Sequence, residues 1–172
     1  MEKKSQNSDA KKVQVIPADV RAGQIISMVE VTGGLGTVID VSRLADELGA
    51  NVAVMLPILE TAELLGLVKS EKGEISLTEF GLKFQKTSKN KVRLLTDQLA
   101  KIEPFKTTAE LAARYGEVTT SQVARSLAER GISWHHDPEL NESLLRALLI
   151  HWALYAGLLT YNKNGNFERT RR

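Results

Sequence analysis

Residues 40–77 read DVSRLADELGANVAVMLPILETAELLGLVKSEKGEISL, and this stretch decides the fold. Asp40 and Asn51 stand where helix N-caps are expected, because each precedes apolar residues at helical spacing. Gly49 closes the first of these helices in the position that favours a left-handed cap. Only a short turn separates the two helices, which is a helix-turn-helix spacing. Residues 67–77 then alternate around a Lys-Gly turn and predict a β-hairpin.

The residues on either side extend this pattern. Apolar residues recur at helical spacing from Asp19 onward and predict a first helix that ends in the glycine-rich turn at residues 32–36. Thr78 is placed to cap a further helix over residues 80–102, broken around residues 87–90. Helix, helix-turn-helix and hairpin in succession is the order of a winged-helix domain.

The second half of the chain repeats this order. Two capping boxes, Thr107 with Glu110 and Thr119 with Gln122, predict two helix starts. A long helix with an apolar stripe over residues 144–159 and a second hairpin follow. We therefore predict a mainly α fold with small β-hairpins (α+β), winged-helix-like and built from two tandem units. The predicted segments are a disordered tail (1–18), a first unit with a trailing helix (19–103) and a second unit (104–172).

Composition excludes several classes of protein. The 172 residues include 23 basic and 21 acidic residues and no cysteine. Without cysteine there is no disulfide, thiolate zinc site or cysteine nucleophile. The first dozen residues lack the apolar core of a signal peptide, and the most apolar stretch, residues 144–159, carries Arg146 and His151. We expect a cytoplasmic protein without membrane insertion.

Charge is distributed unevenly along the chain. Residues 23–68 contain one basic residue, Arg43, against six acids. The candidate recognition helix, residues 52–65, has no Lys or Arg, although DNA-reading helices rely on such side chains. Pro57 is expected to bend or shorten this helix. We predict that this unit contacts protein, with four candidate docking residues: Asp46, Glu47, Glu60 and Glu63.

A basic run has the opposite character. Residues 83–93 contain five basic residues and no acid: Lys83, Lys86, Lys89, Lys91 and Arg93. We interpret them as a solvated helix face, with docking on an acidic protein surface or contact with phosphate as alternatives. We interpret the polar side of the helix at residues 120–130 as a second solvated face. As the alternative, it is the one surface that resembles a base-reading helix, with Ser121, Gln122 and Arg125 as candidate DNA contacts.

Catalytic and ligand sites have little support in the residues. The only histidines are His135, His136 and His151, and adjacent histidines on an extended segment point apart. Residues 33–37 read GGLGT but lack the Lys-Ser/Thr of a nucleotide-binding loop, so we interpret them as a turn. We predict no catalytic residue, no metal, no cofactor and no enzyme activity. An enzyme or metal protein is the third hypothesis and rests on the histidines alone.

The apolar stripe over residues 144–159 is wide enough to complete the core or to form a homodimer seam. We favour the core. Trp134, Trp152 and Tyr155 lie beside or within the stripe, so we assign them to core packing, with stacking on a base or ligand as the alternative.

Several segments together resemble a known family. They are residues 38–45 (VIDVSRLA), 60–68 (ETAELLGLV), 73–81 (GEISLTEFG) and 148–156 (LLIHWALYA), followed by Tyr161. Over residues 25–168 the chain is similar to the AAA-associated C-terminal domain. That domain is found behind the ATPase of nitrate/sulfonate/taurine-type ABC transporters and, especially in archaea, as a separate small protein.

The resemblance implies a stand-alone, non-catalytic, winged-helix-like module with a regulatory role beside a transporter ATPase. The family usually has Gly-Arg after the tryptophan, where this chain has Ala153-Leu154, so no role of that arginine is carried over. The chain has no nucleotide-binding loop or ABC signature, so a role in transport needs an ATPase made as another polypeptide. The acidic helix-turn-helix independently favours protein contact. The alternative function is a DNA-binding winged-helix transcription regulator.

Overall fold

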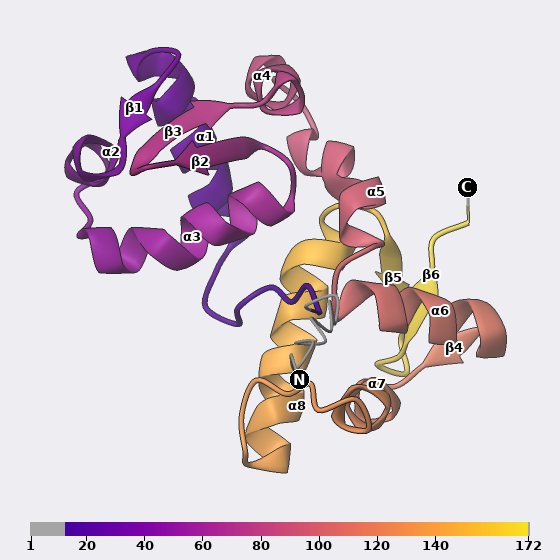
Figure 1. Cartoon of the computed structure of the whole chain (residues 1–172). Coiled ribbons are helices and arrows are strands. Elements are labelled where there is room, and N and C mark those ends of the chain that lie inside the picture. The colour runs from indigo at the N-terminus through magenta and orange to yellow at the C-terminus, as the bar shows by residue number, and fades with distance from the viewer. Residues whose placement is uncertain (1–12, 172) are drawn as a thin grey trace, which may run out of the picture.

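The computed structural model describes residues 13–171, which form two units with the same order of elements (Figure 1). The fold is α+β and winged-helix-like, as predicted from the sequence. The first unit comprises α1 (Ala22–Leu35), β1 (Ile39–Asp40), α2 (Val41–Glu47), α3 (Val52–Leu64), β2 (Val68–Glu71), β3 (Glu74–Leu77) and α4 (Glu79–Lys86). The 3₁₀ helix η1 (Lys91–Leu95) and α5 (Thr96–Leu99) connect it to the second unit. The second comprises α6 (Phe105–Tyr115), β4 (Glu117–Val118), α7 (Thr120–Ala128), α8 (Pro138–Leu148), the π-helix η2 (Leu149–Leu154), β5 (Leu159–Tyr161) and β6 (Phe167–Arg169).

Each unit contains a three-stranded antiparallel sheet. The strand orders are β1-β3-β2 and β4-β6-β5, so the two sheets have equivalent topology. The predicted hairpins are confirmed, with Val68 opposite Leu77 in the first and Tyr161 opposite Phe167 in the second. The third strand of the second sheet, β4, was not predicted, because two residues are too few to show alternation.

Local side-chain caps start the helices where the sequence indicates. The Asp40 carboxylate accepts hydrogen bonds from the N–H groups at the start of α2, and Asn51 Oδ1 accepts one from Val54 N at 2.9 Å. Thr78 caps α4, and the capping box of Thr119 with its partner opens α7. Each cap supplies a partner for an N–H group that the helix itself leaves unsatisfied.

Two predicted helix boundaries are wrong. The helix α1 continues through Gly33 and Gly34 to Leu35, so the glycine-rich stretch is its last turn and no loop. A side chain at Gly33 would collide with Gln85 of α4, so the missing Cβ permits close packing of the two helices. The predicted capping box at Thr107 does not form, because α6 begins earlier, at Phe105.

At the start of α6, the side chain of Glu103 accepts the hydrogen bonds that stabilise the first turn. Its carboxylate is buried and accepts hydrogen bonds from Thr107 N at 3.1 Å and Thr107 Oγ1 at 2.9 Å. Arg130, two residues after the end of α7, forms a salt bridge with the same carboxylate, with 2.9 Å between Arg130 Nη2 and Glu103 Oε1. A buried carboxylate needs such partners because burial alone strongly disfavours its charge.

The segment before α1 joins the two units. The predicted tail includes residues 13–18, but Ile16 is fully buried and Val15 pairs with Glu103 in a parallel bridge. The tail prediction is therefore wrong for residues 13–18, while residues 1–12 lie outside the described residues. Figure 1 shows this segment, in indigo, passing from the first unit to the second.

Two tryptophans fix this joining segment. Trp134 Nε1 donates a hydrogen bond to Ile16 O at 2.8 Å, and Trp152 Nε1 donates one to Val20 O at 3.1 Å. Trp152 is fully buried, as predicted, and Trp134 is half-buried. The core assignment of Tyr155 is wrong, because that side chain is 64% exposed.

The cores of the units come from the apolar faces that the periodicity indicates. Buried residues of the apolar stripe, including Leu145, Leu148, Leu149 and Trp152, pack inside the second unit, which supports the core interpretation of that stripe. The stripe does not lie on one α-helix, because α8 ends at Leu148 and continues as η2. In the described part of the chain, no helix combines the length and apolar character that crossing a membrane requires.

We expect Trp152→Phe to lower the free energy of unfolding by about 2 kcal/mol. The substitution removes indole atoms from a packed site and leaves Val20 O without its donor. Tyr155→Phe, at the exposed position three residues later, is the control and should change stability by less than about 0.5 kcal/mol. Urea denaturation followed by circular dichroism measures both. Equal stability of the two variants would show that the indole contact does not hold the segment.

Candidate protein-docking site

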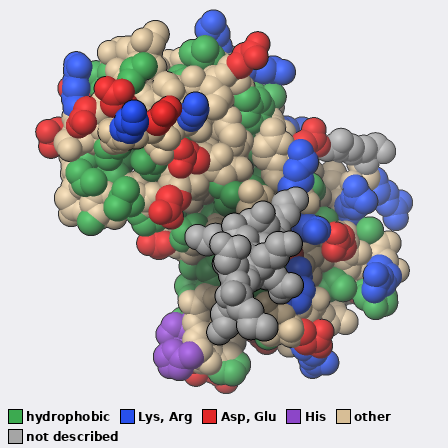
Figure 2. Space-filling view, in the orientation of Figure 1, with side chains coloured by type: hydrophobic (Ala, Val, Ile, Leu, Met, Phe, Trp, Pro, Cys, Tyr) green, Lys and Arg blue, Asp and Glu red, His purple; other side chains and the backbone are tan. Residues whose placement is uncertain are grey.

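The outer face of α3 is apolar at its start and acidic further along. Val52, Val54 and Leu56 are 39%, 51% and 46% exposed, and Glu60 is exposed one turn later. We call these four residues the α3 outer face. In the first unit α3 is the second helix of the helix-turn-helix, the element that enters the major groove in DNA-binding proteins of this architecture. Figure 2 shows hydrophobic and acidic side chains together over the region of α2 and α3.

Pro57 was expected to bend or shorten α3, and the expected shortening is wrong. The helix spans Val52–Leu64, with Pro57 inside it. Proline removes one backbone donor from the helix interior. The acceptor that loses its helical donor is therefore Ala53 O. The Thr61 hydroxyl donates to a different carbonyl, Pro57 O, at 2.7 Å.

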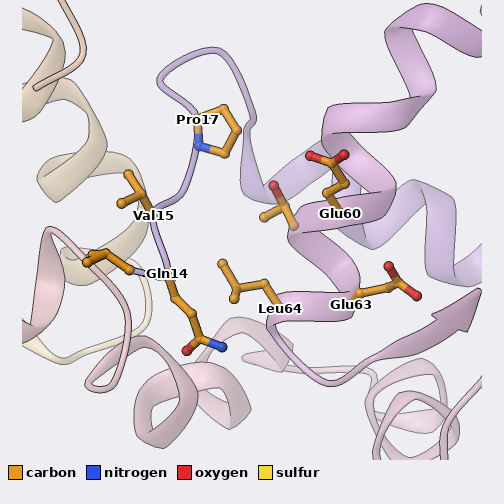
Figure 3. Close-up of a pocket in the computed structure, with 8 residues that line it drawn as sticks. Gln14, Val15, Pro17, Glu60, Glu63 and Leu64 are labelled. Atoms are coloured by element: carbon orange, nitrogen blue, oxygen red, sulfur yellow. The ribbon is translucent and has the colours of Figure 1, made fainter. Parts of the chain in front are cut away.

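A groove of about 450 Å³ separates α3 from the joining segment (Figure 3). Leu64 projects from α3 toward Gln14 and Val15, while Glu60 and Glu63 lie on the α3 side. The lining residues are Val13, Gln14, Val15, Pro17, Glu60, Thr61, Glu63 and Leu64. Among residues 13–171, those that line the groove include two carboxylates and no Lys or Arg, so this part of the lining is acidic.

The two glutamates of the groove differ in their contacts. Glu63 Oε1 accepts hydrogen bonds from Ser70 N and Ser70 Oγ, both at 2.6 Å, which fixes the side chain against β2. Glu60 is exposed and makes no ion pair with any residue from 13 to 171. Glu60 is therefore the carboxylate with the greater freedom to meet an incoming cation.

The four predicted docking residues do not form one cluster. Asp46 and Glu47 are exposed at the end of α2, and neither lines the groove. Glu60 lies eight residues after the start of α3, about 12 Å along the helix axis. The structure thus brings Glu60 and Glu63 to the groove and leaves Asp46 and Glu47 at the other end of the helix-turn-helix.

The predicted basic patch loses one member. Lys91 Nζ lies 2.6 Å from Glu30 Oε1, and its side chain is only 13% exposed, so this lysine joins η1 to α1. Its ammonium also lies 5.7 Å from the centre of the Phe84 ring. The other members, Lys83, Lys86, Lys89 and Arg93, are exposed.

The candidate DNA-contact helix does not have the place of a recognition helix. Ser121, Gln122 and Arg125 are exposed on α7, but α7 matches α2 in the order of elements, and α8 matches α3. Gln122 Oε1 also accepts a hydrogen bond from Thr119 N at 2.9 Å, so its amide is used in the helix cap.

Within the described range, the three histidines lie in no cluster that could hold a metal ion. Among residues 13–171, no group of three or more His, Cys, Asp or Glu side chains is placed to hold a metal ion. The rings of His135 and His136 do not point apart as expected, since their centres are 4.2 Å apart. The segment is turned, with Asp137 N donating to His135 Nδ1 at 3.0 Å.

Sequence reasoning missed half of the groove. Gln14, Val15 and Pro17 were assigned to the tail, and the exposed aliphatic residues of α3 were assigned to no surface. The signal for the first group is the apolar run in residues 13–16, VQVI, which interrupts an otherwise polar terminus. No sequence signal places that run opposite α3, because the contact depends on the packing of both units.

The sequence profile of the C-terminal AAA-associated domain matches residues 42–162, which is 121 of the 172 residues. The chain belongs to this family. The matched range includes all of α3 and every element of the second unit except β6. Neither a curated protein nor a solved structure matched the chain.

Proposed function

We propose that this protein is a non-catalytic regulatory and interaction module that docks on an ABC transporter ATPase made as a separate polypeptide. The docking surface is the α3 outer face together with the groove beside it. The proposal places the protein in the cytoplasm, where it would meet the nucleotide-binding part of a transporter.

The observation that carries this proposal is the chemistry of α3. A helix in the recognition position of a DNA-binding domain exposes basic and amide side chains to phosphates and base edges. Here the exposed side chains of α3 include Val52, Leu56 and Glu60. When another protein covers exposed aliphatic side chains, the free energy of the system falls. A glutamate on the same surface repels phosphate.

Membership of the AAA-associated family supports an ATPase as the partner class. The transporter type of that ATPase rests on the resemblance of the quoted segments. A docked module can also regulate the ATPase. If it binds one conformation of the ATPase more tightly than another, it shifts the equilibrium toward the conformation that it binds.

We expect Leu56→Glu to weaken association with the ATPase by at least tenfold. The substitution places a charge in the middle of the apolar part of the α3 outer face, where a docked partner would exclude water. Leu140→Glu is the matched control, because Leu140 is 45% exposed on α8 and Leu56 is 46% exposed on α3.

The measurement is co-purification of tagged variants with transporter ATPase subunits from native lysate, followed by titration of the purified pair. Binding of the Leu140→Glu variant should equal that of the unchanged protein. Equal binding of the Leu56→Glu variant would remove the α3 outer face from the proposal. Recovery of DNA-associated proteins without any ATPase would contradict the proposal as a whole.

DNA binding is the second candidate function. The observation in its favour is that Lys83, Lys86 and Lys89 are exposed around the end of α4 and make no ion pair with any described residue. Three such cations suffice to attract a phosphate backbone at low salt. The acidic α3 opposes this binding in the same unit.

We expect no measurable binding of a random labelled DNA duplex at physiological salt in a fluorescence-anisotropy titration. The DNA candidate predicts instead a steep salt dependence. The triple substitution Lys83→Ala, Lys86→Ala and Lys89→Ala would then reduce the slope by about 0.9 for each phosphate that the protein no longer neutralises. A matched control removes three exposed lysines elsewhere: Lys101, Lys106 and Lys163. Weaker binding confined to the first triple variant would favour the DNA candidate.

A further inference from the structure

The joining segment has one paired edge and one open edge. Ile16 N donates to Glu103 O at 3.3 Å, and Glu103 N donates to Gln14 O at 2.9 Å. Backbone groups of successive residues in an extended segment point to opposite edges. The N–H and C=O of Val15, between these two, therefore point away from Glu103. No hydrogen bond joins either group to another residue in the range 13–171.

The open edge belongs to a residue that lines the acidic groove. Val15 and Leu64 line it from opposite sides, with the carboxylates of Glu60 and Glu63 nearby (Figure 3). Unpaired backbone donors and acceptors at a strand edge are a template for another extended chain. The groove thus combines an apolar surface and negative charge, and one of its lining residues, Val15, has a backbone N–H and C=O without partners among residues 13–171.

We propose that the groove binds an extended, basic segment of a partner protein by strand addition. The backbone of that segment pairs with Val15, an apolar side chain packs on Leu64, and a Lys or Arg side chain meets Glu60. Peptide recognition at open strand edges takes this general form. The inference rests on the proposed function and deepens it, because it states which kind of partner segment the site receives.

The geometry selects an extended segment over a helix. A helix uses its own backbone groups internally and has a diameter of about 10–12 Å, so it cannot pair with the edge of Val15. The charge of the groove selects basic side chains, because a carboxylate of the partner would face both glutamates. A phosphate backbone is disfavoured for the same reason.

Two short probe peptides test the proposal on the full-length protein. One is an acetylated and amidated hexapeptide of alternating Lys and Val, and the other has alternating Glu and Val. We expect the Lys-Val peptide to shift the amide resonance of Val15 in ¹⁵N spectra and to slow its hydrogen exchange at least tenfold. The Glu-Val peptide should leave the Val15 amide unchanged.

Substitution of the carboxylate tests the charge contribution. Glu60→Gln should weaken binding of the labelled Lys-Val peptide by about two- to five-fold at low salt, as expected for one exposed ion pair. Glu139→Gln, at an exposed position on α8 outside the groove, is the control and should bind as the unchanged protein does. Circular dichroism confirms that both variants are folded.

The proposal is overturned if the Glu-Val peptide binds equally well, or if the Lys-Val peptide binds without any change at Val15. It is also overturned if neither peptide binds. If neither peptide binds but the protein still binds the ATPase and Leu56→Glu weakens that binding, the proposed function stands, with the α3 outer face as its surface. If the Lys-Val peptide binds at Val15 but the protein binds no ATPase, the groove remains a peptide-binding site and an ATPase is rejected as the partner.

Discussion

Two indole hydrogen bonds hold the segment on which the arrangement of the two units depends. Trp134 and Trp152 both belong to the second unit, and each donates its N–H to a backbone carbonyl of the segment that leads into α1 of the first. The same segment pairs with Glu103, whose buried carboxylate is compensated by Arg130. Because the segment is fixed on this side, its other side becomes a defined wall of the groove opposite α3. The groove between the two units thus depends on the few hydrogen bonds that hold this segment in place.

The architecture and the surface chemistry of the first unit point to different partners. A helix-turn-helix followed by a hairpin is an architecture used for reading DNA, but the charge over residues 23–68 is negative and α3 exposes aliphatic side chains. The negative charge of this stretch disfavours a phosphate backbone at α3, since like charges repel before any specific contact forms. Membership of the AAA-associated family agrees with a protein partner. The basic residues of α4 lie on another surface, and one member of that run, Lys91, is held by Glu30.

The sequence predicted the features that depend on neighbouring residues. Asp40, Asn51 and Thr78 cap helices as expected, because a cap involves only the next few backbone groups. Features that depend on distant contacts were missed or wrong. Gly33 was assigned to a turn, although it lies inside α1 next to the Gln85 side chain of α4. At the start of α6, the buried Glu103 accepts the hydrogen bond of Thr107 N. The Gln14–Pro17 side of the groove was missed for the same reason, because Val15 lies opposite Leu64 only when both units are packed.

Hydrogen–deuterium exchange of the full-length protein, alone and mixed with a transporter ATPase as the proposed partner, tests the central claim most directly. That claim is that the α3 outer face and the adjoining groove form the working surface. We predict slower exchange in residues 13–17 and 52–64 on mixing, with no change in α7. Slower exchange confined to residues 83–93 or to α7 on addition of a DNA duplex, with no change at α3 in the presence of the ATPase, would contradict it.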